Sequence, residues 1–304
     1  MQTTSHLLMI RPVNFGFNAE TAVNNSFQQN STAADTNEKA VKEFDEFVAL
    51  LQGHGVDVTV VEDTPDPHTP DSIFPNNWIS FHDSGRVLLY PMFAQNRRLE
   101  RKDHVVRAVR DKFTVNETID LSGYEAKNIF LEGTGSMVLD RDNRITYACL
   151  SPRTDLEALD EFCRVLDYKK LVFHASDAED RPIYHTNVMM CVADRYVVIC
   201  LDSVRDAQEK QSLLESFANT EKDVITISID QMNHFAGNML QVENNSGEKF
   251  LVMSTQAWNS LTGAQQETLS EINRVLHASL QTIETNGGGS ARCMMAEVHL
   301  SRKN

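Results

Sequence analysis

The sequence predicts an α/β protein arranged as a closed ring of five like modules, and two observations carry this expectation. A small or polar residue at a turn, followed by a short apolar strand, occurs five times. The copies cover residues 77–81, 135–139, 187–191, 238–242 and 293–297. Their first residues recur every 51 to 58 positions, which is typical of repeated supersecondary units. Coincidence is the alternative, because short apolar strands are common.

Helical patterns lie between these strands. The expected helices cover residues 38–52, 97–112, 151–166, 203–218 and 262–276. Each has apolar residues at helical spacing. Ser151 and Pro152 are expected to start the third helix, because proline suits the first helical position. Thr262 and Gln265 form a capping-box pattern for the fifth, with Leu276 as its last inward-facing residue.

Further strands are expected on either side of each helix. They cover residues 56–61, 86–90, 170–174, 196–201, 223–229 and 249–254. The repeated unit is therefore strand–strand–helix–strand. Residues 18–37 are rich in Asn, Ser, Thr and Gln and poor in apolar residues, which predicts a loop or lid.

Composition limits the possible functions. The chain has 304 residues, 41% of them hydrophobic, which is enough for a sizeable core, and we expect one domain over residues 1–304. The formal net charge of -15 disfavours nucleic acid and anionic membrane as partners and favours a small-molecule substrate. The sequence contains no pattern that indicates the oligomeric state.

Targeting and metal-binding patterns are also missing from the sequence. No apolar stretch has the length of a signal peptide or a membrane span. The five cysteines are odd in number and not closely paired, which favours a reducing compartment, so we expect a cytoplasmic protein. The cysteines and histidines form no metal-ligand spacing, and we expect neither a metal nor a cofactor.

The segment before the last copy is the strongest single candidate for chemistry. Gly287, Gly288 and Gly289 precede Ser290, Ala291, Arg292 and Cys293. Glycines let a backbone approach a ligand closely, and a cation beside a cysteine favours a reactive thiolate. Cys293 is expected at the head of a strand. The alternative is a glycine-rich turn that leads to an ordinary buried cysteine.

The heads of three other copies carry further candidates. These are Asp71 with Asn76 and Asn77, Glu132, and His185 with Asn187. In a ring the heads would converge on Cys293, which would bring together a nucleophile, an acid/base and an orienting carboxylate. Turn formation by the aspartate and asparagines, and a half-buried histidine without a role, are the alternatives.

Taken in order, these residues resemble the guanidine-modifying superfamily of arginine deiminases, dimethylargininases, succinylarginine dihydrolases and amidinotransferases. The resemblance spans nearly the whole chain. Residues 74–77 and 84–87 are most similar to bacterial amidinotransferase-type proteins that include citrulline hydrolases. The resemblance implies a five-bladed α/β-propeller, the pentein fold, and an enzyme without a cofactor.

The resemblance also implies roles for the candidates. Cys293 would attack the central carbon of a guanidino or ureido group, and His185 would protonate the departing amine and then activate water. Glu132 would orient His185, and Asp71 would line the pocket. Arg292 and Arg11 are candidates for the substrate carboxylate, although thiolate stabilisation and a surface salt bridge are equally open for them.

The expected activity is hydrolysis of a linear C–N bond in a citrulline- or arginine-like amino acid. Asn77 and Asn187 stand where arginine-using relatives often place carboxylates. Because an amide offers both a donor and an acceptor but no charge, this favours a neutral ureido substrate such as citrulline. An amidinotransferase, in which an amine replaces water, and a catalytically silent binding protein of the same fold remain the alternatives.

Overall fold

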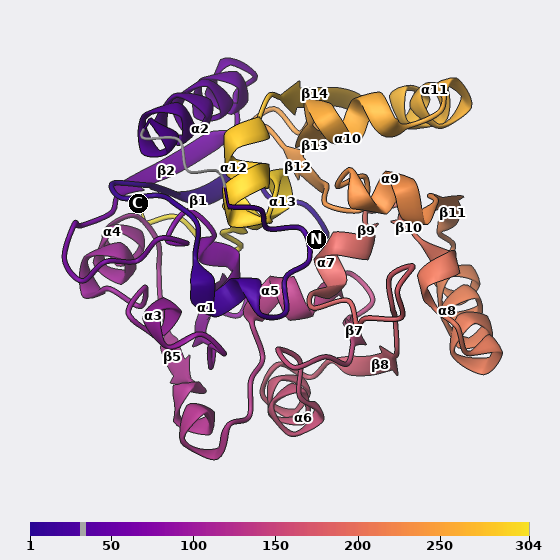
Figure 1. The fold of residues 1–304 in the computed structure, drawn as a ribbon, viewed down its shortest axis with the longest axis horizontal. Helices are drawn as coiled ribbons and strands as arrows, with labels where there is room; N and C mark the ends of the chain where they lie inside the picture. Colours follow the sequence, from indigo (N-terminus) through magenta and orange to yellow (C-terminus); the bar gives the residue numbers. More distant parts are fainter. Residues whose placement is uncertain (31–34, 304) are drawn as a thin grey trace.

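Five three-stranded sheets form the ring that the repeat predicts, in a computed structural model that describes residues 1–30 and 35–303 (Figure 1). In each sheet the central strand pairs antiparallel with one neighbour and parallel with the other. The sheets are β3 (Ile79–Phe81), β4 (Arg86–Leu89) and β5 (Glu117–Asp120); β6 (Val138–Asp140), β7 (Ile145–Cys149) and β8 (Lys169–Phe173); β9 (Met190–Val192), β10 (Tyr196–Ile199) and β11 (Asp223–Thr226); β12 (Leu240–Glu243), β13 (Lys249–Ser254) and β14 (Arg274–Ala278); β15 (Ala296–Glu297), β1 (His6–Arg11) and β2 (Asp57–Glu62).

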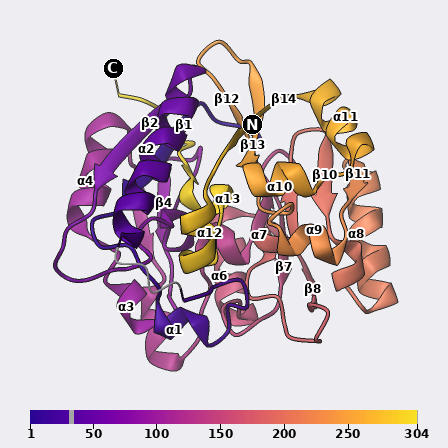
Figure 2. The ribbon, with the colours of Figure 1, turned by 45° about the horizontal axis from the view of Figure 1, so that its top comes forward.

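Helices join the two parallel strands of every sheet. They are α2 (Thr36–Gly53), α3 (Gln95–Arg98), α4 (Asp103–Lys112), α6 (Leu156–Leu166), α8 (Ala207–Asn219), α10 (Thr255–Ser260) and α11 (Gly263–Ile272). Figure 1 shows the longer ones at the outside of the ring, and the turned view of Figure 2 shows the same order. The expected strand–strand–helix–strand unit is therefore present five times, and the chain has the pentein fold.

The ring is closed by its first and last strands. β15 pairs antiparallel with β1, with Leu7 opposite Glu297 and Leu8 opposite Ala296. β1 in turn runs parallel to β2. One sheet therefore takes strands from both ends of the sequence.

The core lies between each sheet and the helix that covers it. In α6, Leu159, Phe162 and Leu166 are buried at helical spacing and belong to the same apolar cluster as Ala148 of β7. Burying a side chain of this size stabilises a fold by roughly 1.5–3 kcal/mol. This packing fixes the sheets around the ring, so that the residues before each first strand meet at its centre.

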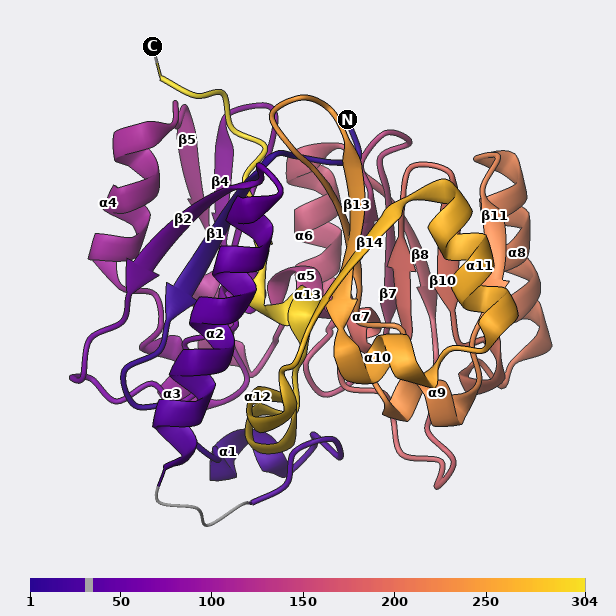
Figure 3. The same ribbon diagram turned by 90° about the horizontal axis from the view of Figure 1, so that it is seen from above.

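Short helices and 3₁₀ turns complete the fold, several of them at the centre of the ring. They are α1 (Ala19–Ala22), α5 (Gly133–Ser136), α7 (Thr186–Met189), α9 (Ile229–Asn233), α12 (Gln281–Gly287) and α13 (Ala291–Met294), with the 3₁₀ turns η1 (Pro75–Asn77), η2 (Ser122–Lys127) and η3 (Leu201–Ser203). Seen from above in Figure 3, α1 and α12 lie at one end of the molecule and both chain ends lie at the other.

The repeated segments differ locally from expectation. Their first residues were expected in or directly before strands, but η1, α5, α7 and α13 place a helical turn there. Cys293 accordingly lies in α13, and the strand that follows it begins at Ala296. A single turn aims polar groups at the ring centre before the chain extends into the sheet.

Two expected helices begin elsewhere. The helix expected over residues 97–112 is divided into α3 and α4, and at the break Lys102 turns its ammonium group to Asp63. The helix expected from Ser151 begins at Leu156, because the side chain of Asp155 caps it by accepting from the backbone N–H of Glu157 at 2.8 Å. Residues 151–154 form a turn instead.

Smaller differences concern residues 223–276 and the expected lid. β11 ends at Thr226, because Ser228 starts α9 with a capping box. The capping box of α11 is confirmed, but Leu276 lies in β14. Within residues 18–37 the structure has α1 and the start of α2, while residues 31–34 lie outside the described residues.

Candidate active site

Cys293, His185, Asp71 and Asn77 line one cavity at the ring centre. Its empty volume is about 260 Å³. Glu132 is fully buried directly behind His185, to which it is hydrogen-bonded. The structure thus brings together five of the residues that the sequence singled out, from four different modules.

A glycine-rich corner delivers the thiol to this cavity. α12 ends at Gly288, which has a φ of +62°, and a Cβ there would lie 2.5 Å from Asn25 Nδ2. Glycine adopts this conformation without steric strain, so the position suits no other residue. The hydroxyl of Tyr184 donates to the carbonyl of Gly288 at 2.7 Å and fixes the corner. The Cys293 side chain follows in α13 and is almost completely buried.

Two amides surround the sulfur atom. Asn238 Nδ2 lies 3.2 Å from Cys293 Sγ, and Asn187 Nδ2 lies 3.6 Å from it. Asn238 is itself held by the backbone N–H of Arg292, which donates to its Oδ1 at 3.1 Å. N–H groups that point at sulfur stabilise its negatively charged form. The two amides can therefore stabilise negative charge that develops on the sulfur in a reaction.

The imidazole and carboxylate form a direct pair. His185 Nε2 lies 2.8 Å from Glu132 Oε2, and Glu132 Oε1 accepts from the backbone N–H of Phe93 at 2.9 Å. In the tautomer that donates from Nε2 to Glu132, the Nδ1 lone pair is free to take a proton. Glu132 thus fixes the orientation of the ring.

Burial and neighbouring charges set the protonation of this pair. Burial lowers the pKa of His185 to about 4, although Glu132 opposes the shift, so the imidazole is neutral near pH 7. Burial alone would raise the pKa of Glu132, but the guanidinium of Arg153 and the bond to His185 overcome it and lower that pKa. The site therefore holds a neutral base beside a fixed negative charge.

Asp71 presents a second carboxylate to the cavity. Its Oδ2 accepts from Asn18 Nδ2 at 2.8 Å and from Thr21 Oγ1 at 3.2 Å, and Arg97 Nε lies 3.9 Å away. Its Oδ1 is buried and has no hydrogen-bond partner in the described part of the chain. Burial raises the pKa of Asp71 against the opposing pull of Arg97. An unpaired buried oxygen of this kind is suited to a donor from a ligand.

Asn76 and Asn77 differ in their positions. Asn76 Nδ2 donates to Thr134 Oγ1 at 3.2 Å, which ties η1 to α5. Asn77 lines the cavity, where its Oδ1 accepts from Arg97 Nη1 at 2.8 Å. A Cβ at Gly135 would lie 2.4 Å from Asn77 Nδ2 and 2.8 Å from His185 Nδ1, so glycine is needed there for both side chains to fit.

Arg11 and Arg292 lie away from this cavity. Arg11 is partly exposed and pairs with Asp45 and Glu62 on the surface. Arg292 directly precedes Cys293 in the chain, but its guanidinium turns to the carbonyl of Met295 and to Glu297. Neither side chain lines the pocket of Cys293, which corrects the expectation that they hold the substrate carboxylate.

Two arginines that the sequence did not indicate line the cavity instead. Arg97 is held by Glu100 at 2.8 and 3.0 Å, and Arg153 by Asn24 and the carbonyl of Thr21. Both are almost completely buried, and the guanidinium carbon of Arg153 lies 4.8 Å from the centre of the Tyr184 ring. Their bonds anchor α1 and α3 over the site.

Comparison with known proteins decides the family. The family described as N,N dimethylarginine dimethylhydrolase, eukaryotic, matches residues 11–300. The chain belongs to this family. It is thus a member of the guanidine-modifying superfamily, as the ordered set of residues suggested.

A curated protein with a different description is also similar to this chain. The bifunctional arginine dihydrolase/ornithine cyclodeaminase AgrE of Nostoc sp. (strain PCC 7120 / SAG 25.82 / UTEX 2576) is 24% identical over 279 residues. That match covers 90% of this dimethylhydrolase family member but 35% of AgrE. The chain therefore spans about a third of its curated relative.

Solved structures share the fold. The substrate-bound N-terminal domain of ArgZ, an arginine dihydrolase from cyanobacteria, has a TM-score of 0.76 at 19% identity and covers 96% of this chain and 97% of that one. A dimethylarginine dimethylaminohydrolase adduct has a TM-score of 0.67 at 16% identity, covering 98% of this chain and 100% of that one.

Metal-binding clusters and membrane-spanning helices are both absent from the described residues. No cluster of three or more His, Cys, Asp or Glu side chains placed to hold a metal occurs among them. The helices in the same residues include none long and apolar enough to cross a membrane.

Proposed function

We propose that the protein hydrolyses the guanidino group of an arginine-like amino acid, with Cys293 as nucleophile. One observation carries the proposal: a buried cysteine, a His–Glu pair and an aspartate with an unpaired oxygen line or adjoin one small cavity. Membership of the dimethylhydrolase family and the names of ArgZ and AgrE support a guanidino substrate.

In the proposed first step, His185 takes the thiol proton through Nδ1 and Cys293 Sγ attacks the guanidino carbon. The tetrahedral intermediate collapses when the protonated His185 delivers that proton to the leaving amine. The sulfur is left bound to the carbon that retains the amino-acid chain. The amides of Asn187 and Asn238 stabilise the sulfur as its charge changes.

In the second step, water enters the place of the departed amine. His185 removes a proton from this water, which attacks the thio-substituted carbon. The carbon–sulfur bond then breaks, Cys293 is regenerated, and the product carries a ureido group. Glu132 stabilises the imidazolium formed in each step, because its carboxylate lies 2.8 Å from Nε2.

The balance of buried charge favours a cationic substrate. Three carboxylates, Asp71, Glu100 and Glu132, face two guanidinium groups, Arg97 and Arg153. When all five are ionised, one negative charge is uncompensated, and a substrate guanidinium would balance it. In this proposal Asp71 supplies the charge that Asn77 and Asn187 lack, so we expect a guanidino substrate to be preferred over the citrulline that the asparagines alone favour.

Mass spectrometry of the acid-quenched protein tests the reaction. With arginine or dimethylarginine, a hydrolase of this kind accumulates an adduct on Cys293 that retains the amino-acid chain and lacks one amine. An amidinotransferase would retain only the amidino group. Cys293→Ser should form no adduct, whereas Cys163→Ser, on the outer helix α6, should behave as the wild type.

Steady-state kinetics on arginine, dimethylarginine and citrulline then identify the substrate. We expect kcat/KM to be higher for one of the two guanidino compounds than for citrulline. A clear preference for citrulline would refute the charge argument while leaving the covalent mechanism intact. Failure of all three to bind or react would leave the silent binding protein as the interpretation.

A further inference from the structure

A second cavity lies at the opposite end of the strands from Cys293. The turns that carry Asn77, Glu132 and Cys293 precede β3, β6 and β15, whereas this cavity is lined by residues that follow the same three strands. They are His82 and Arg86 after β3, Arg141 and Arg144 after β6, and His299 after β15. The cavity has an empty volume of about 410 Å³ and plays no part in the proposed reaction.

Arg141 is the central residue of this cavity. Only 6% of its side chain is exposed. Its Nε lies 3.4 Å from Glu297 Oε1, but Arg292 holds the other oxygen of that carboxylate at 2.5 Å. The two terminal nitrogens of Arg141 have no hydrogen-bond partner in the described part of the chain. A nearly buried guanidinium is thus left with most of its donors unused.

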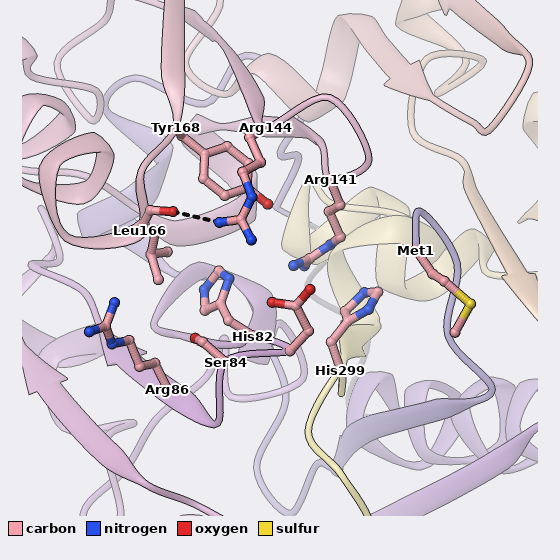
Figure 4. A pocket seen from close by; sticks show the side chains of 10 residues that line it. Met1, His82, Ser84, Arg86, Arg141, Arg144, Leu166, Tyr168 and His299 are labelled. Carbon is pink, nitrogen blue, oxygen red and sulfur yellow. Dashed lines mark hydrogen bonds between the residues drawn. The ribbon is translucent and has the colours of Figure 1, made fainter.

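Arg144 and Arg86 add positive charge nearby. Arg144 Nη1 donates to the carbonyl of Leu166 at 3.1 Å, and Figure 4 shows the Arg144 and Arg141 guanidinium groups turned toward the same space. Arg86 is more strongly engaged, with Glu117 at 3.0 Å and the carbonyl of Val165 at 2.8 Å. Within a chain of net charge -15 this concentration of cations is a local exception, and Glu117 and Glu297 offset part of it.

Two imidazoles flank the arginines. His299 Nε2 is buried and makes no hydrogen bond with the described residues; Glu297 Oε1 lies 3.8 Å from it, and 7% of the side chain is exposed. Burial lowers the pKa of His299 to about 4, so the ring is neutral near pH 7 and can offer one N–H. His82 Nε2 is taken by Ser80 Oγ at 2.8 Å. Figure 4 places both rings beside Arg141.

We propose that this cavity binds a small oxyanion, a carboxylate or phosphate group, with Arg141 as its main ligand and Arg144 and His299 as flanking donors. Guanidinium groups bind such anions through paired, charge-assisted hydrogen bonds. The bound anion would satisfy both the free nitrogens of Arg141 and the orphaned Nε2 of His299. The proposal does not depend on the catalytic function.

Asp83 provides a test with the opposite sign. It lines the cavity, is exposed, and forms no ion pair with the described residues. Its charge opposes an incoming anion. Asp83→Asn should therefore strengthen anion binding, which a general loss of structure could not do.

Histidine NMR distinguishes this cavity from the active site. Inorganic phosphate and succinate are titrated separately into the ring-labelled protein, with KCl adjusted to keep ionic strength constant. We expect saturable shifts of the His82 and His299 resonances, assigned by His→Gln variants, with His185 unmoved. Saturable shifts with either anion would support the site, and the anion that causes them would identify the class of ligand. Shifts confined to His185, or none for either anion, would overturn it.

Variants give the second readout. Arg141→Gln should weaken binding by about tenfold or more, since a charge-assisted pair is lost. Arg195→Gln is the matched control, because Arg195 occupies the corresponding hairpin between β9 and β10 and is exposed. If Arg141→Gln does not fold, Arg144→Gln and Asp83→Asn replace it, with weaker and tighter binding expected. Unchanged affinity in the folded variants contradicts the proposal.

Discussion

We propose that Asp71 selects a positively charged substrate over a neutral one. Its buried Oδ1 has no partner among the described residues, and a substrate N–H would supply one. We expect Asp71→Asn to lower kcat/KM for arginine by about 10–100-fold, because a hydrogen bond to a charged group contributes roughly 1.5–3 kcal/mol. Citrulline turnover should change much less. Kinetics on both substrates check this, with the exposed Asp66→Asn as control; equal losses on both would contradict the role in charge recognition.

The Gly135→Ala variant tests whether activity depends on the close packing of the side chains around this glycine. An added Cβ would meet Asn77 Nδ2 at 2.4 Å and His185 Nδ1 at 2.8 Å. Gly135→Ala should displace the imidazole and reduce kcat by roughly 10²-fold or more, the lower end of what acid–base catalysis contributes. Gly53→Ala, where nothing lies within 4 Å, should retain activity. A wild-type kcat in Gly135→Ala would show that catalysis does not depend on the exact position of the His185 imidazole.

Site residues that stand at or near the start of a repeated copy could be predicted from the sequence, whereas the two arginines that stand elsewhere could not. Cys293, His185 and Glu132 stand at or beside the heads of their copies. Asn238 heads the fourth copy in the same way, so the repeat register alone could have identified it as a neighbour of the sulfur. Arg97 lies in the short helix α3 and Arg153 in the turn of residues 151–154, neither in a recognisable motif, and only tertiary packing brings them inward.

At the scale of elements, the ring and its long helices follow from periodicity, but the central turns do not. A turn such as α5 or α13 contains four residues, which is too short for a helical period to be visible. Such a turn is also unstable alone and persists through its packing at the ring centre. Asp155 rather than Ser151 or Pro152 starts α6, because its side chain caps the helix and residues 151–154 form a turn.

The connection between α12 and α13 predicts a pH effect on stability. The carboxylate of Glu284 accepts a hydrogen bond from Ser290 Oγ at 2.6 Å, and Ser290 directly precedes α13. Burial raises the pKa of Glu284 to about 7. Because the folded pKa exceeds that of the unfolded chain, the native state binds the extra proton. This contribution is fully present below about pH 4.5 and is lost as pH rises through about 7.

Glu284→Gln removes this dependence. From pH 5 to pH 8 the wild type should lose up to about 3 kcal/mol of unfolding free energy that the variant does not lose, at 1.36 kcal/mol per pKa unit. Urea denaturation at both pH values measures the difference. Parallel pH profiles for the two proteins would exclude a raised pKa at Glu284.

At the scale of the whole molecule, stability should depend on closure of the ring. Removing residues 296–304 deprives β1 of its antiparallel partner β15, leaving only its pairing with β2, and deletes the buried Ala296, Val298 and Leu300. At roughly 1.5–3 kcal/mol for the larger side chains alone, the loss approaches the total of about 5–15 kcal/mol that keeps a domain folded. We expect no cooperative thermal transition by circular dichroism.

A shorter truncation is the control for ring closure. Removing residues 302–304 leaves β15 and its pairing with β1 intact and deletes exposed side chains, including that of Arg302. Its Tm should stay within about 5 °C of the wild type, since surface changes rarely exceed about 0.5 kcal/mol. A cooperative transition in the longer truncation would mean that four modules hold together without the fifth.

The first sheet also fixes the order of events during synthesis. β1 is translated before the other four modules, whereas its partner β15 is translated after them. Cys293, three residues before β15, emerges at the same late moment. A nascent chain that still lacks this segment has neither a finished ring nor a thiol at its centre. In the proposed reaction, a chain that terminates before this segment lacks its nucleophile, and Cys293 is added only after the other four modules have been made.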